Sequence, residues 1–222
     1  MVTLKALQAR RFAGTYGDLL RSREYGAAAR FFLNDLYSDK DYSERDAQFS
    51  RIAGALQRLF PQQVIATAVA LAELHVLTEE LDWHMASAWE HTEGASTADN
   101  SDAARYIACW RTVGRNSERL NQLDIVLNVG KDLDRLTRTH GLRLMLRMMR
   151  GPARAANLGS LQDFLETGFD TFANMSGTGR SADKFLDTIR ERESAWIEQL
   201  SYGDIAQCNA ALVTCLSADT VR

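Results

Sequence analysis

The stretch PQQVIATAVALAELHVLTEELDWHMASAWEH, residues 61–91, determines the class of fold that this sequence encodes. Its apolar residues recur every three or four positions, which is the spacing of one face of an α-helix. Pro61 suits the first turn of such a helix, because the chain needs no hydrogen bond from a backbone N–H there. The pattern therefore predicts one long helix that reaches about His91, and we expect this helix at the centre of the molecule.

Apolar side chains fall on two flanks of this predicted helix. One flank holds Leu74, Leu77, Leu81 and Met85, and the other holds Val69, Ala72, Val76 and Trp83. A helix with two apolar flanks is typical of one that packs between neighbouring helices. We therefore expect both flanks to be covered.

Helical periodicity also dominates the rest of the chain, as in segments 101–110, 116–136, 160–175 and 181–197. Only two of the 222 residues are proline, which leaves long helices unbroken. No alternation of apolar and polar residues bounded by hairpin turns is present. We predict an all-α fold, one domain over residues 1–222 with about eight or nine helices, in which segment 92–100 is the weak point for a boundary.

Composition is typical of a folded soluble protein, with 45% hydrophobic residues, 25% charged residues and a net charge of -3. No run of about 18 uncharged apolar residues is present, so we predict no membrane-spanning helix. The N-terminus lacks the apolar core of a secretory signal. The three cysteines, Cys109, Cys208 and Cys215, include no CxxC pair and fit a reducing compartment. These features favour a cytoplasmic location.

Three segments resemble a known family. They are FFLNDLYSDKDYSERD (31–46), ELHVLTEELD (73–82) and LQDFLETGFDTFANM (161–175). The chain resembles an uncharacterised family of bacterial proteins, in which an FFL-x-DLY segment is followed by a run ending in RD and later by an LQDFLE-like helix. The resemblance implies an all-helical bacterial protein, and it carries no known activity and no catalytic residue.

Signatures of common enzymes are missing from the sequence. The Gly-rich segment MSGTGRS (175–181) lacks the spacing of a phosphate-binding P-loop and follows no predicted strand. No nucleophile elbow, zinc-protease helix, dinucleotide fingerprint or EF-hand spacing is found. These observations favour a non-enzymatic protein without a cofactor.

A Glu/His stripe on the long helix offers a different interpretation. The stripe consists of Glu73, Glu80, His84 and His91, which fall within about 20° of one line. Carboxylate and imidazole groups can bind iron, manganese or zinc, and His84 could bind haem. Further ligands would have to come from facing helices, with Asp35, Tyr37 and Asp124 as candidates. The stripe must then face inward; the competing interpretation is a stripe that is solvated or paired internally.

A basic segment is the second candidate site. Six arginines and no acidic residue lie between Arg135 and Gln162. Four of them form a candidate site for an anion or a partner: Arg143, Arg147, Arg150 and Arg154. The first three share one helical face, opposite Leu144 and Met148. Guanidinium groups suit carboxylates and phosphates, so an anionic surface is one possible partner.

The acidic segment 35–46 could neutralise these arginines, within one chain or between two chains. The net charge of -3 argues against general affinity for nucleic acid. The leading hypothesis is therefore a non-enzymatic helical protein that binds another macromolecule or itself, as a homodimer. The alternative is a metal- or haem-binding protein that uses the Glu/His stripe.

Overall fold

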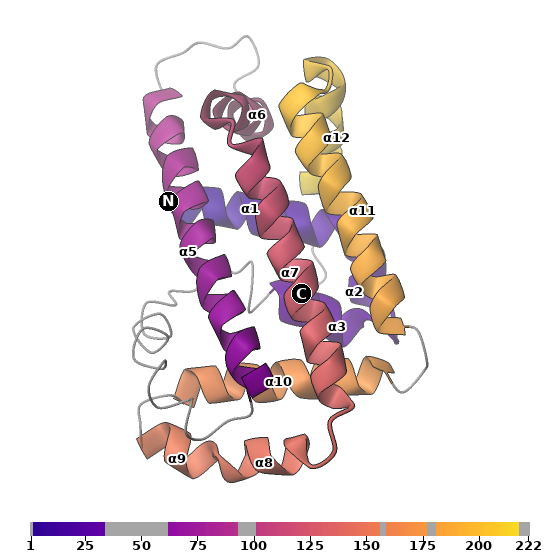
Figure 1. The fold of residues 1–222 in the computed structure, drawn as a ribbon. Helices are drawn as coiled ribbons and strands as arrows, with labels where there is room; N and C mark the ends of the chain where they lie inside the picture. Colours follow the sequence, from indigo (N-terminus) through magenta and orange to yellow (C-terminus); the bar gives the residue numbers. More distant parts are fainter. Residues whose placement is uncertain (1, 34–61, 93–100, 156–158, 177–180, 218–222) are drawn as a thin grey trace.

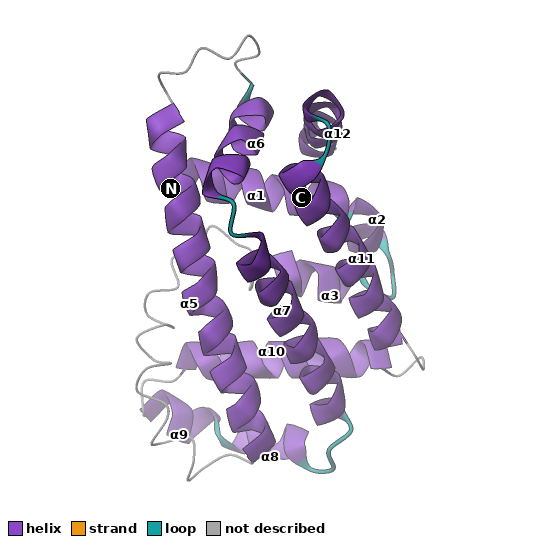
Figure 2. Ribbon diagram, turned by 45° about the horizontal axis from the view of Figure 1, so that its top comes forward, coloured by secondary structure: helices purple, strands orange, loops and turns teal. Residues whose placement is uncertain are grey.

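The computed structural model describes residues 2–33, 62–92, 101–155, 159–176 and 181–217. These residues contain helices and no β-strand, so the protein is all-α, as predicted (Figure 2). The helices are α1 (Val2–Thr15), α2 (Gly17–Arg21), α3 (Gly26–Phe31), α5 (Gln62–His91), α6 (Asp102–Val113), α7 (Asn116–Thr137), α8 (Leu142–Met148), α9 (Arg150–Ala155), α10 (Gly159–Ser176), α11 (Ser181–Tyr202) and α12 (Ile205–Ser217).

Short helices make the described part more divided than the sequence predicts. The apolar pattern from Leu4 to Leu20 predicts one helix, but the backbone leaves the helical region at Tyr16, so this stretch forms α1 and α2. The side-chain oxygen of Ser22 then accepts hydrogen bonds from the N–H groups of Glu24 and Tyr25 in the turn before α3. Such local breaks fall inside continuous apolar patterns, and periodicity alone does not reveal them.

The long helices α5, α7 and α11 lie side by side, with α7 between the other two (Figure 1). The predicted long helix is confirmed as α5, but α7 takes the central position. Gly130 makes this possible on one side, because a Cβ atom there would lie 2.5 Å from a methyl carbon of Leu186 on α11. Helix α5 therefore packs against neighbours on one side and leaves its opposite side exposed.

Helices α8, α9 and α10 run across one end of these long helices (Figures 1 and 2). They enclose a small apolar core of their own with the start of α5 and the end of α7. It contains Val64, Ala68, Leu136, Leu142, Leu146, Ala153, Leu165 and Phe169. The larger core lies among the remaining helices and is rich in aromatic side chains, including Phe12, Tyr106, Phe172 and Phe185.

Helix α1 crosses behind the long helices and packs against α12 (Figure 1). The two backbones meet at Gly14, where an added Cβ atom would lie 2.0 Å from the carbonyl oxygen of Cys215. Only glycine permits this approach. Among the described helices, none is long and apolar enough to cross a membrane.

Candidate functional site

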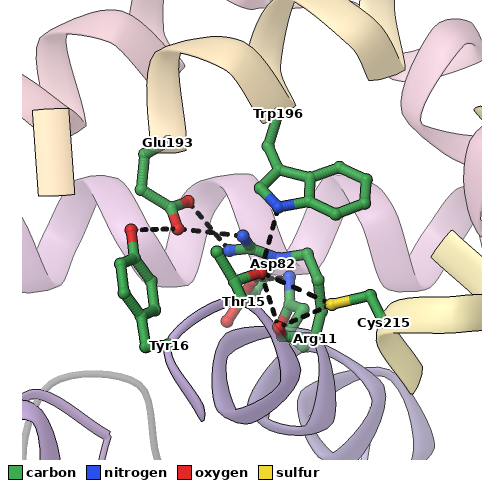
Figure 3. Close-up of polar contacts among 8 residues, drawn as sticks. Arg11, Thr15, Tyr16, Asp82, Glu193, Trp196 and Cys215 are labelled. Atoms are coloured by element: carbon green, nitrogen blue, oxygen red, sulfur yellow. Dashed lines mark hydrogen bonds and ion pairs between the residues drawn. The ribbon is translucent and has the colours of Figure 1, made fainter. Parts of the chain in front are cut away.

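A buried ion pair joins α1 to α11. Two guanidinium N–H groups of Arg11 donate to the two carboxylate oxygens of Glu193, both at 2.9 Å (Figure 3). Both side chains are only 9% exposed. The hydroxyl group of Tyr16 donates to the same carboxylate at 2.9 Å. Burial by itself lowers the pKa of Arg11, but the Glu193 carboxylate outweighs it and raises the pKa above its usual value.

Thr15 connects the same two helices to α12. Its hydroxyl oxygen accepts a hydrogen bond from the indole N–H of Trp196 at 2.9 Å and donates to the backbone carbonyl of Arg11 at 2.8 Å (Figure 3). The thiol of Cys215 donates to that carbonyl at 3.1 Å, and its sulfur lies 3.4 Å from the threonine hydroxyl. The half-buried Cys215 therefore acts as a packing contact between α1 and α12.

A second group of buried polar side chains lies where α1, α5, α6 and α7 meet. The amide of Gln8 donates to the carboxylate of Asp82 at 3.1 Å. Burial raises the pKa of Asp82, and it raises the pKa of Tyr106 as well. The guanidinium of Arg119 lies 3.5 Å from the ring centroid of Trp110, and burial lowers its pKa.

These two groups form one buried polar cluster whose side chains come from six helices, namely α1, α5, α6, α7, α11 and α12. Opposite charges lie close to one another, and each of the two acids accepts hydrogen bonds from its neighbours. Among the described residues, the terminal nitrogen Nη2 of Arg119 has no hydrogen-bond partner although it is buried. The arrangement supports a structural function, because every other charge in the cluster is used to hold helices together.

The sequence contains one hint of this cluster. Arg11 lies on the apolar face of its helix, between Leu7 and Phe12, where a charged group needs a buried partner. Its partner, Glu193, is 182 residues away, so no local spacing indicates the pairing.

The Glu/His stripe lies on the surface of α5. Glu73, Glu80 and His91 are exposed, and His84 is half-buried beside the ring of Trp83. The carboxylate of Glu80 binds Arg115 at 2.7 Å, and Nδ1 of His91 lies 2.6 Å from the carbonyl oxygen of Ser87. The inward orientation that a metal or haem site needs is therefore not observed.

Of the three candidates for additional ligands, only Asp124 lies in the described part of the chain. Asp124 is exposed and pairs with Arg190 at 3.3 Å, while Asp35 and Tyr37 lie outside the described residues. Within the part of the chain that the structure describes, no three His, Cys, Asp or Glu side chains are placed to hold a metal ion.

The four arginines of the basic segment lie at the end of the molecule formed by α8 and α9. Arg143 binds Asp170 at 2.9 Å, and Nε of Arg150 donates to Glu166 at 2.8 Å. This contact with Arg150 lowers the pKa of Glu166. Arg147 and Arg154 are exposed. The acids that pair here come from α10; the acidic segment 35–46, expected as a partner, lies outside the described residues.

Two apolar surfaces differ from expectation. On α5, Val69, Val76 and Trp83 are 50%, 66% and 60% exposed, so none of the described helices covers the flank that they form. On α8, Leu144 and Met148 are 64% and 69% exposed, whereas Leu142 and Leu146 fill the core beneath them. Arg143 and Arg147 are exposed as well, so the prediction that the arginines lie on a face opposite Leu144 and Met148 is wrong. Both helices place apolar residues on more than one side, and packing covers only one side of each.

Comparison with known proteins gives a family without an activity. A family model described as "Domain of unknown function (DUF8198)" matches residues 1–207 of the chain. No curated protein and no solved structure matches.

Proposed function

The chain belongs to the family described as Domain of unknown function (DUF8198), and from this premise we propose that it is a non-enzymatic protein that pairs with a second copy of itself. The surface for this pairing is the outer stripe of α5, which consists of Val69, Val76 and Trp83. All three side chains are at least half exposed. Exposed apolar side chains that follow one line along a helix offer a contact surface to a second helix.

The spacing within the outer stripe supports a helix as the occupant. The three residues are seven positions apart, so they follow one line along α5 with a step of about 10.5 Å. Apolar residues at this interval form the seam between two packed helices. A straight helix of 30 residues offers enough length for such a contact.

The order of side-chain sizes supports a second copy of α5 in particular. An antiparallel pair with its two-fold axis at Val76 places this residue opposite its own copy. Val69 then lies opposite Trp83 of the second copy, so that a small side chain meets a large one at both ends. Two-fold symmetry repeats each contact, which is the usual arrangement in homodimers.

The charges beside the outer stripe permit this arrangement. Glu79 binds Nζ of Lys5 and Glu80 binds Arg115, each at 2.7 Å. Two of the acidic groups that would approach the second copy are therefore compensated within their own chain. Repulsion between like charges is reduced accordingly.

The expected dimer is weak. The stripe from Val69 to Trp83 is about 21 Å long, and one helix on each side buries less area than a stable dimer requires. Association should therefore depend on concentration and be visible by sedimentation or light scattering in the range of about 10–500 µM, which corresponds to association free energies of about −7 to −4.5 kcal/mol.

Sedimentation equilibrium of the wild-type chain and of Val76→Glu tests the proposal. Val76→Glu places two carboxylates opposite each other on the two-fold axis and should abolish dimer formation. The matched control is Val213→Glu on α12, where the wild-type side chain is also exposed. A wild-type monomer at every concentration, or equal effects of the two variants, would contradict the proposal.

A cross-linking experiment tests the position of the axis. In the proposed dimer, Val76→Cys meets its own copy and should form a disulfide-linked dimer under mild oxidation. Val213→Cys is again the control and should form no disulfide-linked dimer, although its α5 surface is unchanged. Cross-linking of both variants to the same extent would show random collision and would exclude the axis at Val76.

A further inference from the structure

We propose that the basic end of the molecule binds the surface of an anionic lipid bilayer. The basic end consists of the outward side chains of α8 and α9, namely Arg143, Leu144, Arg147, Met148 and Arg154. This inference depends on a different surface from the outer stripe of α5, so the two proposals stand or fall separately.

The first observation is a pair of exposed apolar side chains. Leu144 and Met148 are 64% and 69% exposed and lie one helical turn apart on the same side of α8. The buried side of this helix is fully occupied, since Leu142 and Leu146 are 3% exposed. The outward pair thus plays no part in the core.

The second observation is the positive charge around this pair. Arg143 precedes Leu144 and Arg147 precedes Met148, and each arginine is exposed. Arg154 adds a further exposed guanidinium from α9. No acidic residue lies on either helix, because none exists between Arg135 and Gln162. Exposed leucine and methionine with flanking arginines are typical of helices that lie in the membrane interface.

The third observation is the placement of the two helices. They lie across the end of the long helices, beside α10 (Figures 1 and 2). The acids that face the arginines, Asp170 and Glu166, belong to α10 on the inner side. The outermost layer of this end therefore presents apolar and positively charged groups together.

These observations favour a lipid surface over a polynucleotide. Guanidinium groups bind the phosphates of both. Only the bilayer also accepts the side chains of Leu144 and Met148, which transfer from water to the acyl-chain boundary. An acidic protein surface is the other possible partner for these arginines. The experiment below distinguishes the two, because its vesicles contain lipid and no protein.

Vesicle co-sedimentation of the full chain tests the proposal. The probes are vesicles of phosphatidylcholine alone and vesicles in which about one third of the lipid is phosphatidylglycerol. The chain should bind the anionic vesicles and not the neutral ones. Increasing the ionic strength from about 0.1 M to about 1 M should weaken binding strongly, because the screening length falls from about 10 Å to about 3 Å.

Two pairs of variants separate the contributions of charge and apolar contact. Arg147→Glu combined with Arg154→Glu should weaken binding by at least about 25-fold, since each arginine near an anionic surface contributes about fivefold. The control with the same change in net charge is Arg10→Glu combined with Arg23→Glu, two exposed arginines on other parts of the fold. Leu144→Ser combined with Met148→Ser should weaken binding at both ionic strengths. Its control, Ile205→Ser combined with Val213→Ser on α12, should bind as the wild type does.

The outcomes are decisive because all of these side chains are exposed and their replacement leaves the core intact. The proposal is overturned if the wild-type chain does not co-sediment with anionic vesicles at low ionic strength. An acidic protein surface is then the favoured interpretation of the basic end. Equal losses in a variant and its control also overturn it. Loss in the variants alone supports it, and retained binding by Val76→Glu shows that it is independent of self-association.

Discussion

Removing one partner of the buried Arg11–Glu193 pair should be among the most destabilising single changes in this protein. Glu193→Gln keeps the shape of the side chain but removes its charge and replaces one acceptor oxygen by an NH₂ group. The guanidinium of Arg11 then loses one of its two hydrogen bonds of 2.9 Å and remains charged in a site where its side chain is 9% exposed. Breaking a buried ion pair in this way costs about 3–5 kcal/mol of unfolding free energy.

The loss of unfolding free energy arises because one buried charge is left without its partner, so the loss should be smaller when both charges are removed. Arg11→Met combined with Glu193→Leu should be less destabilising than the sum of Arg11→Met and Glu193→Leu measured separately. Tyr16→Phe removes the third hydrogen bond to the carboxylate and should cost about 2 kcal/mol, as expected for a bond to a charged group. If the single charge variants fail to fold, the unfolding free energy of Tyr16→Phe still tests the contribution of the Glu193 carboxylate.

Urea denaturation followed by far-ultraviolet circular dichroism measures these free energies, provided the slopes with urea agree between variants. The matched control is Asp18→Asn. Asp18 binds Arg192 through two hydrogen bonds of 2.7 and 2.8 Å between the same regions of the chain, but it is 57% exposed. This exposed pair should contribute less than about 1 kcal/mol. The reasoning is refuted if Glu193→Gln costs no more than Asp18→Asn, or if the double variant equals the sum of the singles.

Three further predictions use the same assay. Burial raises the pKa of Asp82, so the folded state binds a proton at this carboxyl more tightly than the unfolded state does. This difference in proton binding stabilises the folded state fully below about pH 4, and the stabilisation is lost as the pH rises through the pKa of the folded state. Asp82→Asn should remove this loss, and an unchanged pH dependence between about pH 4 and 7 would contradict it. Gly14→Ala should destabilise strongly because a Cβ atom there meets the backbone of α12 at 2.0 Å, whereas Gly159→Ala should be close to neutral, because the Cβ atom there makes only an ordinary contact of 3.6 Å with the side chain of Arg154; similar effects would refute the close approach. Arg119→Met should cost much less than Arg11→Met, because Arg119 has no ion-pair partner among the described residues and its burial is unfavourable; equal costs would contradict this.

The resemblance to a family without known activity is confirmed, and so is the all-α fold. Both could be predicted from the sequence because they depend on patterns of residues that lie close together along the chain. The apolar spacing in residues 61–91 predicts a helix that the structure has at Gln62–His91, and the pattern in 160–175 predicts one that spans Gly159–Ser176. Backbone hydrogen bonds in a helix join residues four apart, so the sequence in one window is sufficient to indicate it.

The candidate sites depend on which side chains are buried, and a short segment of sequence does not contain this information. The periodicity of α5 shows that Val76 and Leu74 are apolar, but only the position of α7 decides that Leu74 is buried and Val76 is exposed. The same holds for the Glu/His stripe, whose spacing fits a metal site while its orientation points to solvent.

Local sequence patterns thus indicate the long helices, the class of fold and the segregation of charge along the chain, but not the breaks between the short helices. The tertiary structure alone decided which face of each helix is covered, and it alone joined Arg11 to Glu193 across 182 positions. The physical reason is that helix formation is a local equilibrium of neighbouring residues, whereas burial depends on how distant helices fit together. A residue's partner in the core is set by shape and charge in space, and its distance along the chain carries no information about either.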